Sequence, residues 1–234
     1  MTTPRRLYRD VAVQAMDDGF AVLLDGKAMK TPAGGSFQLP TRALAEAVAE
    51  EWRQQGPKPR SATMGLTKLC NTSLDKVRPN RDTAIEQILA FGGTDLVCYR
   101  ADSPAELVRR QALAWDPLLK WLHSHYGVAL CTVSQIAFVL QGEDALAAFR
   151  AAISARDDFT VAALSAVAAL TGSLTIALGF VDRYIDAAQA LNAANVDDIY
   201  QEERWGKDEE MTAKTAAKQR ELSAISRFLE LLAQ

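Results

Sequence analysis

The sequence predicts an α+β protein, in which a small N-terminal antiparallel β-sheet with a covering helix precedes a larger all-α helical domain. Apolar residues alternate at a period of two up to Leu39 and recur at helical spacing after Pro40. Residues 159–181 carry no charged side chain and must be hidden from water. Residues 55–60 contain one glycine and two prolines, so we expect the domain boundary there, between domains of residues 1–60 and 61–234.

The composition is that of a soluble globular protein. Hydrophobic residues make up 49% of the 234 residues, enough to bury a sizeable core. The net charge of −3 is nearly balanced, so it favours neither a nucleic-acid partner nor an acidic membrane. No apolar segment follows the arginines near the N-terminus, and the sequence therefore predicts no secretory signal.

The first 40 residues carry the signals of a hairpin sheet. Val11 and Val13 alternate with their neighbours, and Phe20, Val22 and Leu24 follow after a turn. The pair Asp25-Gly26 predicts a two-residue hairpin, since glycine tolerates the positive φ that such turns require. After Pro40, Thr41 is a candidate N-cap for a helix covering this sheet, with apolar residues every fourth position: Leu44, Val48 and Trp52.

The remainder of the chain reads as a series of helices. Helical spacing predicts them over residues 64–77, 81–91 and 182–205, the last closed by Gly206. Ser103-Pro104 predicts a helix start with a capping box to Glu106, and Pro117 is expected to kink or interrupt that helix. Residues 128–140 are compatible with a short strand before a further helix. We expect Asp208 to cap a final helix with one apolar stripe: Leu222, Ile225, Leu229 and Leu232.

The uncharged stretch of residues 159–181 is long enough to raise the alternative of a membrane span. Its many alanines, hydroxyl side chains and glycines favour the protein interior instead. Because Thr171-Gly172-Ser173 weakens a helix near the middle, we expect two shorter buried helices with a turn between them.

Few residues suggest a catalytic, cofactor-binding or metal-binding site. Cys70, Cys98 and Cys131 are widely spaced among apolar neighbours, which predicts buried free thiols, with a reactive thiol as the alternative. His123 and His125 point to different faces of a helix, and no metal motif surrounds them. The sequence lacks a phosphate-binding glycine loop and a nucleophile elbow, so it predicts no catalytic residue, no cofactor and no metal.

The most unusual polar segment is the acidic stretch of residues 196–206. Asp198 and Glu202 are four residues apart and share a helical face with Gln201 and Trp205. Such a face can bind a partner through carboxylates and an aromatic anchor. The alternatives are an acid–base pair and a solvated charged face.

Seven stretches, in order along nearly the whole chain, give a resemblance to a known family. They are RRLYRDV (5–11), LDGKAMKTP (24–32), EEW (50–52), MGLTKLCNTSLD (64–75), TDLVCYR (94–100), WDP (115–117) and YQEERWG (200–206). Together they resemble the assembly chaperone of the F-type ATP synthase catalytic head, the Atp-twelve family of mitochondria and alphaproteobacteria. No one stretch is sufficient, but their joint occurrence in this order is specific.

The resemblance implies a non-enzymatic protein that binds the free alpha subunit and prevents its aggregation until it pairs with beta subunits. It also implies a critical acidic position that maps onto Asp197 or Asp198, and the sequence does not decide between them. We expect Asp197, Asp198 and Glu202 to contact a basic patch of the alpha subunit. Gln201 shares their face, and Tyr200 and Trp205 either anchor the partner or lock the helix.

Two further expectations concern the N-terminal half and the location. Trp52 and residues 66–75 match the family as well, and we expect them to hold the two domains together, with Asn71, Thr72 and Asp75 bonded to backbone; direct contact with the alpha subunit is the alternative. Because the first motif begins at Arg5, we expect a bacterial cytoplasmic protein, or a processed form in the mitochondrial matrix.

Two other functional classes compete with the chaperone. One is a hydrolase that uses the carboxylates between Asp197 and Glu203 in an inter-domain cleft. The other is a membrane-associated assembly factor that uses residues 159–181. The chaperone hypothesis predicts neither membrane insertion nor nucleic-acid binding.

Overall fold

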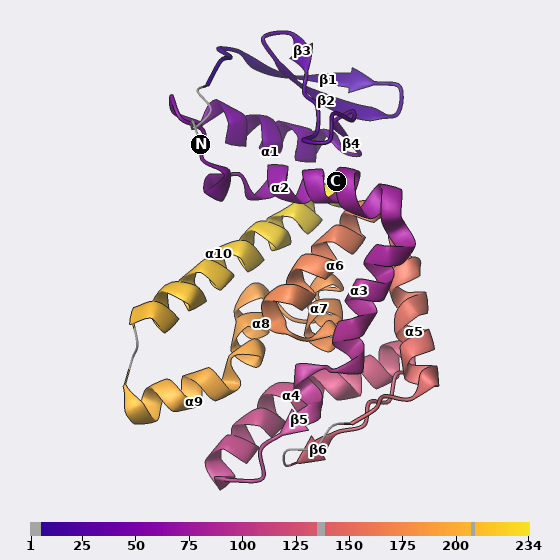
Figure 1. Ribbon diagram of the computed structural model, residues 1–234, viewed down its shortest axis with the longest axis vertical. Coiled ribbons are helices and arrows are strands. Elements are labelled where there is room, and N and C mark those ends of the chain that lie inside the picture. Colours follow the sequence, from indigo (N-terminus) through magenta and orange to yellow (C-terminus); the bar gives the residue numbers. More distant parts are fainter. Residues whose placement is uncertain (1–5, 135–138, 207–208) are drawn as a thin grey trace. The chain divides into compact units, whose positions relative to one another are not determined.

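The structure is a computed structural model that describes residues 6–134, 139–206 and 209–234. Its chain forms two compact units, one reaching from the N-terminus to Arg81 and including Ala224–Gln234, the other spanning Asp82–Ser223. Figure 1 shows a small sheet and many helices, as the α+β prediction requires. The elements of the first unit before residue 81 are β1 (Val11–Met16), β2 (Gly19–Leu24), β3 (Lys27–Ala28), β4 (Gln38–Leu39), α1 (Arg42–Arg53) and α2 (Gly65–Thr72), with short 3-10 and π segments between Ser61 and Asn80.

The second unit is helical apart from two short strands. Its elements are α3 (Arg81–Gly93), β5 (Tyr99–Arg100), α4 (Ala105–Tyr126), β6 (Val133–Ser134), α5 (Glu143–Ser154), α6 (Asp158–Thr171), α7 (Leu174–Val181), α8 (Ala187–Ala194) and α9 (Val196–Trp205). A last helix, α10 (Glu209–Leu232), begins in this unit and ends in the first.

The predicted hairpin is confirmed. β1 and β3 both pair antiparallel with β2, and Asp25-Gly26 joins β2 to β3 with φ of 48° and 79°. Both turn residues therefore have the positive φ of a two-residue hairpin. The Asp25 carboxylate accepts the backbone N–H groups of Arg9 and Asp10, which fixes the chain entering β1 to the turn.

Helix α1 covers the sheet, as expected (Figure 1). The hydroxyl of Thr41 accepts the Leu44 N–H and so caps α1, and the same hydroxyl donates to the Leu231 carbonyl near the end of α10. The buried face of α1 consists of Leu44, Ala45, Val48 and Ala49.

The division between the two units differs from the boundary that we expected at residue 60. The Glu51 carboxylate on α1 accepts the backbone N–H groups of Leu66 and Thr67 at 2.8 and 2.9 Å, at the start of α2. A carboxylate at a helix N-terminus satisfies amides that have no partner within the helix. This interaction joins α2 to α1, so the first unit continues to Arg81.

The end of α10 belongs to the first unit as well. Of the predicted stripe, Leu222 and Ile225 are buried, but Phe228 and Leu231 take the buried positions in place of Leu229 and Leu232, which are half-buried. The spacing of three residues therefore continues to the end of the helix. Asp208, the expected cap, lies outside the described residues.

The uncharged stretch forms the centre of the second unit. Helix α6 ends at Gly172, which has φ of +69°, and the Ser173 hydroxyl then caps α7 by accepting the Ile176 N–H. Every residue of α7 is buried, among α4, α6 and α8. The prediction of two helices with a turn is confirmed. Within the described parts of the chain, no helix combines the length and the apolar character that a membrane crossing requires.

A buried carboxylate anchors the turn between α6 and α7. Asp95 is fully buried and accepts both the backbone N–H and the hydroxyl of Thr175, at 2.9 and 2.8 Å. Its other oxygen accepts the Val97 N–H, and the Leu96 N–H donates to the Gly172 carbonyl. Burial raises the pKa of the Asp95 carboxyl above its ordinary value.

Helix α4 differs from two expectations. Pro117 does not interrupt the helix, so of the two expected effects only a kink stays a prediction, and the N-cap is Pro104, with no side chain capping it. Glu106 binds Arg109 and Arg110 on the same helix instead of reaching back as in a capping box. These charge-assisted pairs use the carboxylate that the box would need.

The helix predicted over residues 182–205 is two helices. Asp186 and Gln189 form a capping box that starts α8, and Asn195, with φ of −120°, separates α8 from α9. Gly206 ends α9 with φ of +94°, as expected. In the segment that we left open, Val133–Ser134 forms a strand parallel to Tyr99–Arg100; residues 135–138 lie outside the described residues.

The cysteine prediction is correct for two of the three residues. Cys70 and Cys98 are buried free thiols, and burial raises the pKa of both, that of Cys98 to about 12. Both thiols therefore stay protonated and unreactive near neutral pH. Cys131 is exposed, contrary to expectation, because it lies in the irregular segment before β6.

Ala168→Asp is expected to unfold the second unit, because Ala168 on α6 is completely buried and an unpaired buried carboxylate costs several kcal/mol. The neighbouring Ala169 is exposed, so Ala169→Asp is the matched control. Circular dichroism during urea titration measures both. Equal stability of the two variants would contradict a core built on α6.

Asp95→Ala is expected to lower the free energy of unfolding by about 2–5 kcal/mol, because three buried donors lose their acceptor. Asp102→Ala changes an exposed aspartate in the next loop and is expected to stay within about 0.5 kcal/mol of the wild type. Chemical denaturation of the three proteins gives the comparison. A loss below 1 kcal/mol for Asp95→Ala would show that the turn does not depend on this carboxylate.

Candidate functional site

The acidic segment forms α9, which packs on α4 within the second unit. Gln111 of α4 is 2% exposed and joins three elements. Its amide nitrogen donates to Asp197 Oδ1 at 2.8 Å, and its amide oxygen accepts the Ala101 N–H at 2.8 Å. Asp197, at the start of α9, is therefore held in one orientation from α4.

A second set of contacts fixes the middle of α9. Arg110 of α4 forms ion pairs with Glu203 at 2.7 Å and with Glu106 at 2.9 Å. The Arg110 guanidinium lies 5.6 Å from the centre of the Tyr200 ring, and that of Arg204 lies 5.1 Å from it. Tyr200 is 5% exposed, so its ring packs and locks the helix; its hydroxyl has no hydrogen-bond partner within the described structure.

The contacts between Arg110 and Glu203 shift the pKa of both groups. The hydrogen bond from Arg110 lowers the pKa of the Glu203 carboxyl, and the bonds to Glu203 and Glu106 raise the pKa of the Arg110 guanidinium. A general acid needs a pKa raised toward neutrality, which is the opposite shift. The geometry therefore gives the hydrolase hypothesis no support at Glu203.

The other face of α9 carries polar side chains that form no hydrogen bond or ion pair within the described parts of the chain. Asp198 and Glu202 are half-buried and Gln201 is exposed, and none of their three side chains forms a hydrogen bond or ion pair with another described residue. Trp205 is 77% exposed at the end of the helix. This set, which we call the α9 face, offers acceptor oxygens beside a large exposed aromatic ring.

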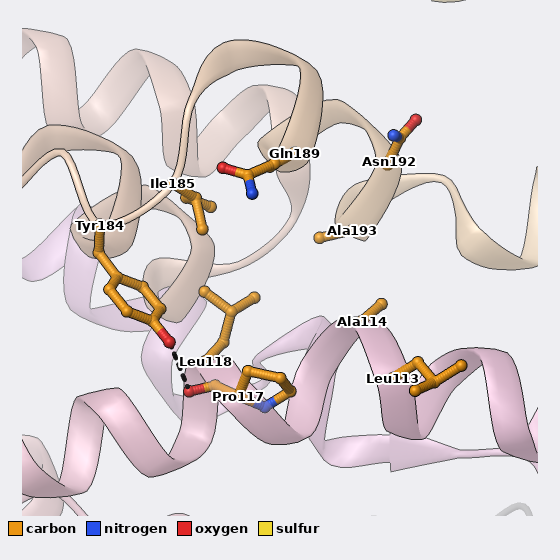
Figure 2. Close-up of a pocket in the computed structure, with 9 residues that line it drawn as sticks. All are labelled: Leu113, Ala114, Pro117, Leu118, Tyr184, Ile185, Gln189, Asn192 and Ala193. Carbon is orange, nitrogen blue, oxygen red and sulfur yellow. Dashed lines mark hydrogen bonds between the residues drawn. The ribbon is translucent and has the colours of Figure 1, made fainter.

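A hollow of about 380 Å³ lies between α4 and α8 (Figure 2). Leu113, Pro117 and Leu118 line it from α4, and Ala193 lines it from α8, where the Ala193 carbonyl accepts the Trp115 Nε1–H at 2.7 Å. Tyr184 closes one end, its hydroxyl 3.4 Å from the Pro117 carbonyl oxygen. Ala114 of this lining lies about one helical turn after Gln111 on α4.

The predicted site residues all lie on α9, but they point to two different faces of this helix. Asp197 and Tyr200 face α4, whereas Asp198, Gln201, Glu202 and Trp205 have no partner among the residues described. The sequence analysis missed Gln111 and Arg110, which position the helix. Gln111 carried a signal, because it occupies an apolar stripe with Trp115, Leu118 and Leu122, and a polar residue in such a stripe needs a buried partner.

The second set of family-like residues lies around Trp52 in the first unit. Trp52 Nε1 donates to the Thr67 hydroxyl at 3.2 Å, which joins α1 to α2. Asp75 accepts the Ala33 N–H at 2.9 Å, and Thr72 donates to the Lys68 carbonyl. The expected bonds to backbone are thus found for Asp75 and Thr72, but Asn71 Oδ1 is buried with no partner in the described chain.

Comparisons with known proteins agree with one another. A family model for the ATP12 chaperone protein matches residues 5–123. The chain is 23% identical over 214 residues to the mitochondrial protein atp12 of Schizosaccharomyces pombe, covering 86% of this chain and 74% of that protein.

Solved structures give closer matches. The crystal structure of Atp12 from Paracoccus denitrificans is 36% identical, with a TM-score of 0.92 over 97% of this chain and 98% of that one. A variant of the Paracoccus protein with one aspartate changed to lysine matches equally well, over 97% of both chains. This chain belongs to the ATP12 chaperone family, the ATP synthase assembly chaperones that its sequence motifs resemble.

Proposed function

We propose that this chaperone binds the unassembled alpha subunit of the F-type ATP synthase catalytic head and keeps it from aggregating until it pairs with beta subunits. The observation that carries the proposal is the α9 face, where Trp205 is 77% exposed beside carboxylates without an internal partner. An exposed tryptophan next to unpaired acceptors has the composition of a binding hot spot.

The charges define what the α9 face recognises. Asp198 and Glu202 lie four residues apart on one face of a helix and present carboxylate oxygens to a basic patch. Because Gln111 and Arg110 hold α9 on α4, the face is rigid before the partner arrives. A rigid face loses less conformational entropy on binding than a mobile one.

The hollow between α4 and α8 adds an apolar element to this surface. Leu113 is 67% exposed at its rim, and Tyr184 is half exposed at its end. A free subunit exposes an apolar interface that would otherwise self-associate, and an apolar hollow can cover part of it. We therefore assign both the α9 face and this hollow to the client.

The proposed mechanism needs no chemical step. The chaperone acts by shape and charge, without ATP and without catalysis, and it releases the client to the beta subunit. We propose a bacterial cytoplasm as its location; the relationship to the Paracoccus protein supports this, and the mitochondrial relative of fission yeast leaves the mitochondrial matrix as the alternative.

The direct test is whether the chaperone captures free alpha subunit. Tagged chaperone is purified from cells that make alpha subunit without beta, and light scattering follows aggregation of the alpha subunit with and without the chaperone. We expect a complex and suppressed scattering. Photo-crosslinkers placed at Asp198 and Trp205 should then join the two proteins. Absence of both the complex and the suppression would end the proposal.

The double variant Asp198→Lys with Glu202→Lys is expected to keep the fold and to lose capture of the alpha subunit by tenfold or more, because two attractive charges become repulsive. Asp102→Lys with Glu143→Lys changes the charge by the same amount at exposed positions of the same unit and serves as control. Affinity is measured by pull-down titration, and folding by circular dichroism. Equal capture by both double variants would exclude the acidic face as the site.

Trp205→Ala is expected to weaken capture by about tenfold, within the range of a hot-spot aromatic, without changing the unfolding midpoint. Leu140→Ala is a matched control, since Leu140 is 78% exposed in the same unit. The same titration and a urea melt compare the two variants. If the Trp205 variant instead unfolds earlier and binds normally, the indole serves packing alone.

A further inference from the structure

The first unit has a second candidate binding surface, around Trp52. One hollow of about 400 Å³ lies against Tyr8, Met29 and Trp52, and another of about 430 Å³ lies against Trp52, Met64 and Asn71. Trp52 lines both hollows, so we call the two together the Trp52 site. Four of the seven stretches that carried the family resemblance contribute to it, and none of them takes part in the α9 face.

The walls of the Trp52 site are fixed by internal contacts. The Tyr8 hydroxyl donates to the Trp52 carbonyl at 2.8 Å, and the two rings lie 5.5 Å apart. The Trp52 indole N–H donates to Thr67, and Asp75 holds the loop that contains Ala33. The Trp52 ring is half-buried, so part of it is open to solvent. The site is therefore formed before any ligand arrives.

The charge balance of the site is positive. Lys27 and Lys30 line the first hollow and Lys76 lines the second; all three are exposed, and their ammonium groups form no ion pair or hydrogen bond with another described residue. Both acidic residues in the linings accept hydrogen bonds from backbone N–H groups. Asp25 accepts those of Asp10 and Arg9, which lower its pKa, the bond from Asp10 having the larger effect. Asp75 accepts the Ala33 N–H. The two linings together hold four lysines (Lys27, Lys30, Lys68 and Lys76) and two aspartates (Asp25 and Asp75), a net charge of +2 that is opposite in sign to the α9 face.

A buried acceptor beside the second hollow favours a polypeptide as the ligand. Asn71 lines this hollow, and its Oδ1 is buried without a partner in the described chain. A buried acceptor without a donor costs roughly 1–3 kcal/mol, which a donor on a ligand would recover once the Asn71 amide turns its oxygen toward the hollow. The apolar side chains of Met29, Met64 and Trp52 suit an apolar residue, and a peptide supplies this together with N–H donors and carboxylates.

We infer that the Trp52 site is a second docking surface for the client, taking an acidic segment that carries an apolar side chain. The apolar side chain occupies a hollow beside Trp52, a donor of the segment bonds Asn71 Oδ1, and neighbouring carboxylates pair with Lys30 and Lys76. This inference rests on the proposed function, because it takes the segment to belong to the alpha subunit. The two surfaces would then select basic and acidic parts of one client.

The test uses overlapping fluorescein-labelled peptides that span the alpha subunit, with fluorescence anisotropy against the full-length chaperone. We expect binding by peptides that combine Asp or Glu with a large apolar residue, weakened by salt. Lys30→Glu with Lys76→Glu is expected to reduce that binding tenfold or more. Arg42→Glu with Lys58→Glu, two exposed cations of the same unit outside both hollows, is the charge-matched control and is expected to bind normally.

Asn71→Leu separates binding from folding. Removing a buried acceptor without a partner is expected to leave the unfolding midpoint unchanged or higher, while peptide affinity falls about threefold or more. A lower unfolding midpoint with unchanged affinity would show that Asn71 is structural and would remove it from the site.

The outcomes distinguish this inference from the proposed function. If whole alpha subunit is captured but no acidic peptide binds, or if both charge variants bind the peptides equally, the Trp52 site is not a docking surface and the α9 proposal stands. If acidic peptides bind but whole alpha subunit is never captured, the proposed client is wrong. The α9 double variant should bind the acidic peptides as the wild type does; loss there would also overturn the separate site.

Discussion

The second unit depends on one buried carboxylate. Asp95 is fully buried, yet it accepts three donors from the turn that enters α7 and from the residues that follow it in the chain. Burying a carboxylate is costly unless its oxygens are satisfied, and these bonds offset the cost. The carboxylate thereby fixes where α6 ends and α7 begins. Helix α7, buried at every position, is the element against which α4, α6 and α8 are placed.

The position of the α9 face is set by a series of contacts that begins at α7. A side chain at Gly179 of α7 would come within 3.2 Å of Leu118, so α4 passes α7 closely because that position is glycine. Trp115 of α4 then bonds the end of α8, and Gln111, one turn earlier, bonds both the segment after Asp95 and the first turn of α9. Each step is a contact between rigid elements. The acidic face is therefore oriented by the core, although none of its outward-facing residues belongs to the core.

Much of this arrangement could be predicted from local sequence. The hairpin at Asp25-Gly26, the cap at Thr41 and the turn at Gly172 each depend on the conformational preference of one or two residues, and each was correct. Errors arose where a distant partner decides the structure. Glu106 was expected to cap its own helix but pairs with Arg109 and Arg110, and the break at Asn195 within 182–205 has no proline or glycine to announce it. The residues that orient the site, Gln111 and Arg110, lie some ninety positions before α9, a separation over which periodicity carries no information.

The bond between Thr41 and Leu231 has a consequence for how the protein is made. These residues are 190 positions apart in sequence, and the whole of the second unit lies between them. At a translation rate of about 5–20 residues per second, the first unit waits roughly 10–40 s after Thr41 is synthesised before Ile225, Phe228 and Leu231 reach it. The second unit, in contrast, is continuous and can fold during that interval. The N-terminal sheet and its helix thus leave the ribosome before the second unit and are completed after it, so that a newly made chaperone passes through a period in which part of its own apolar core is still exposed.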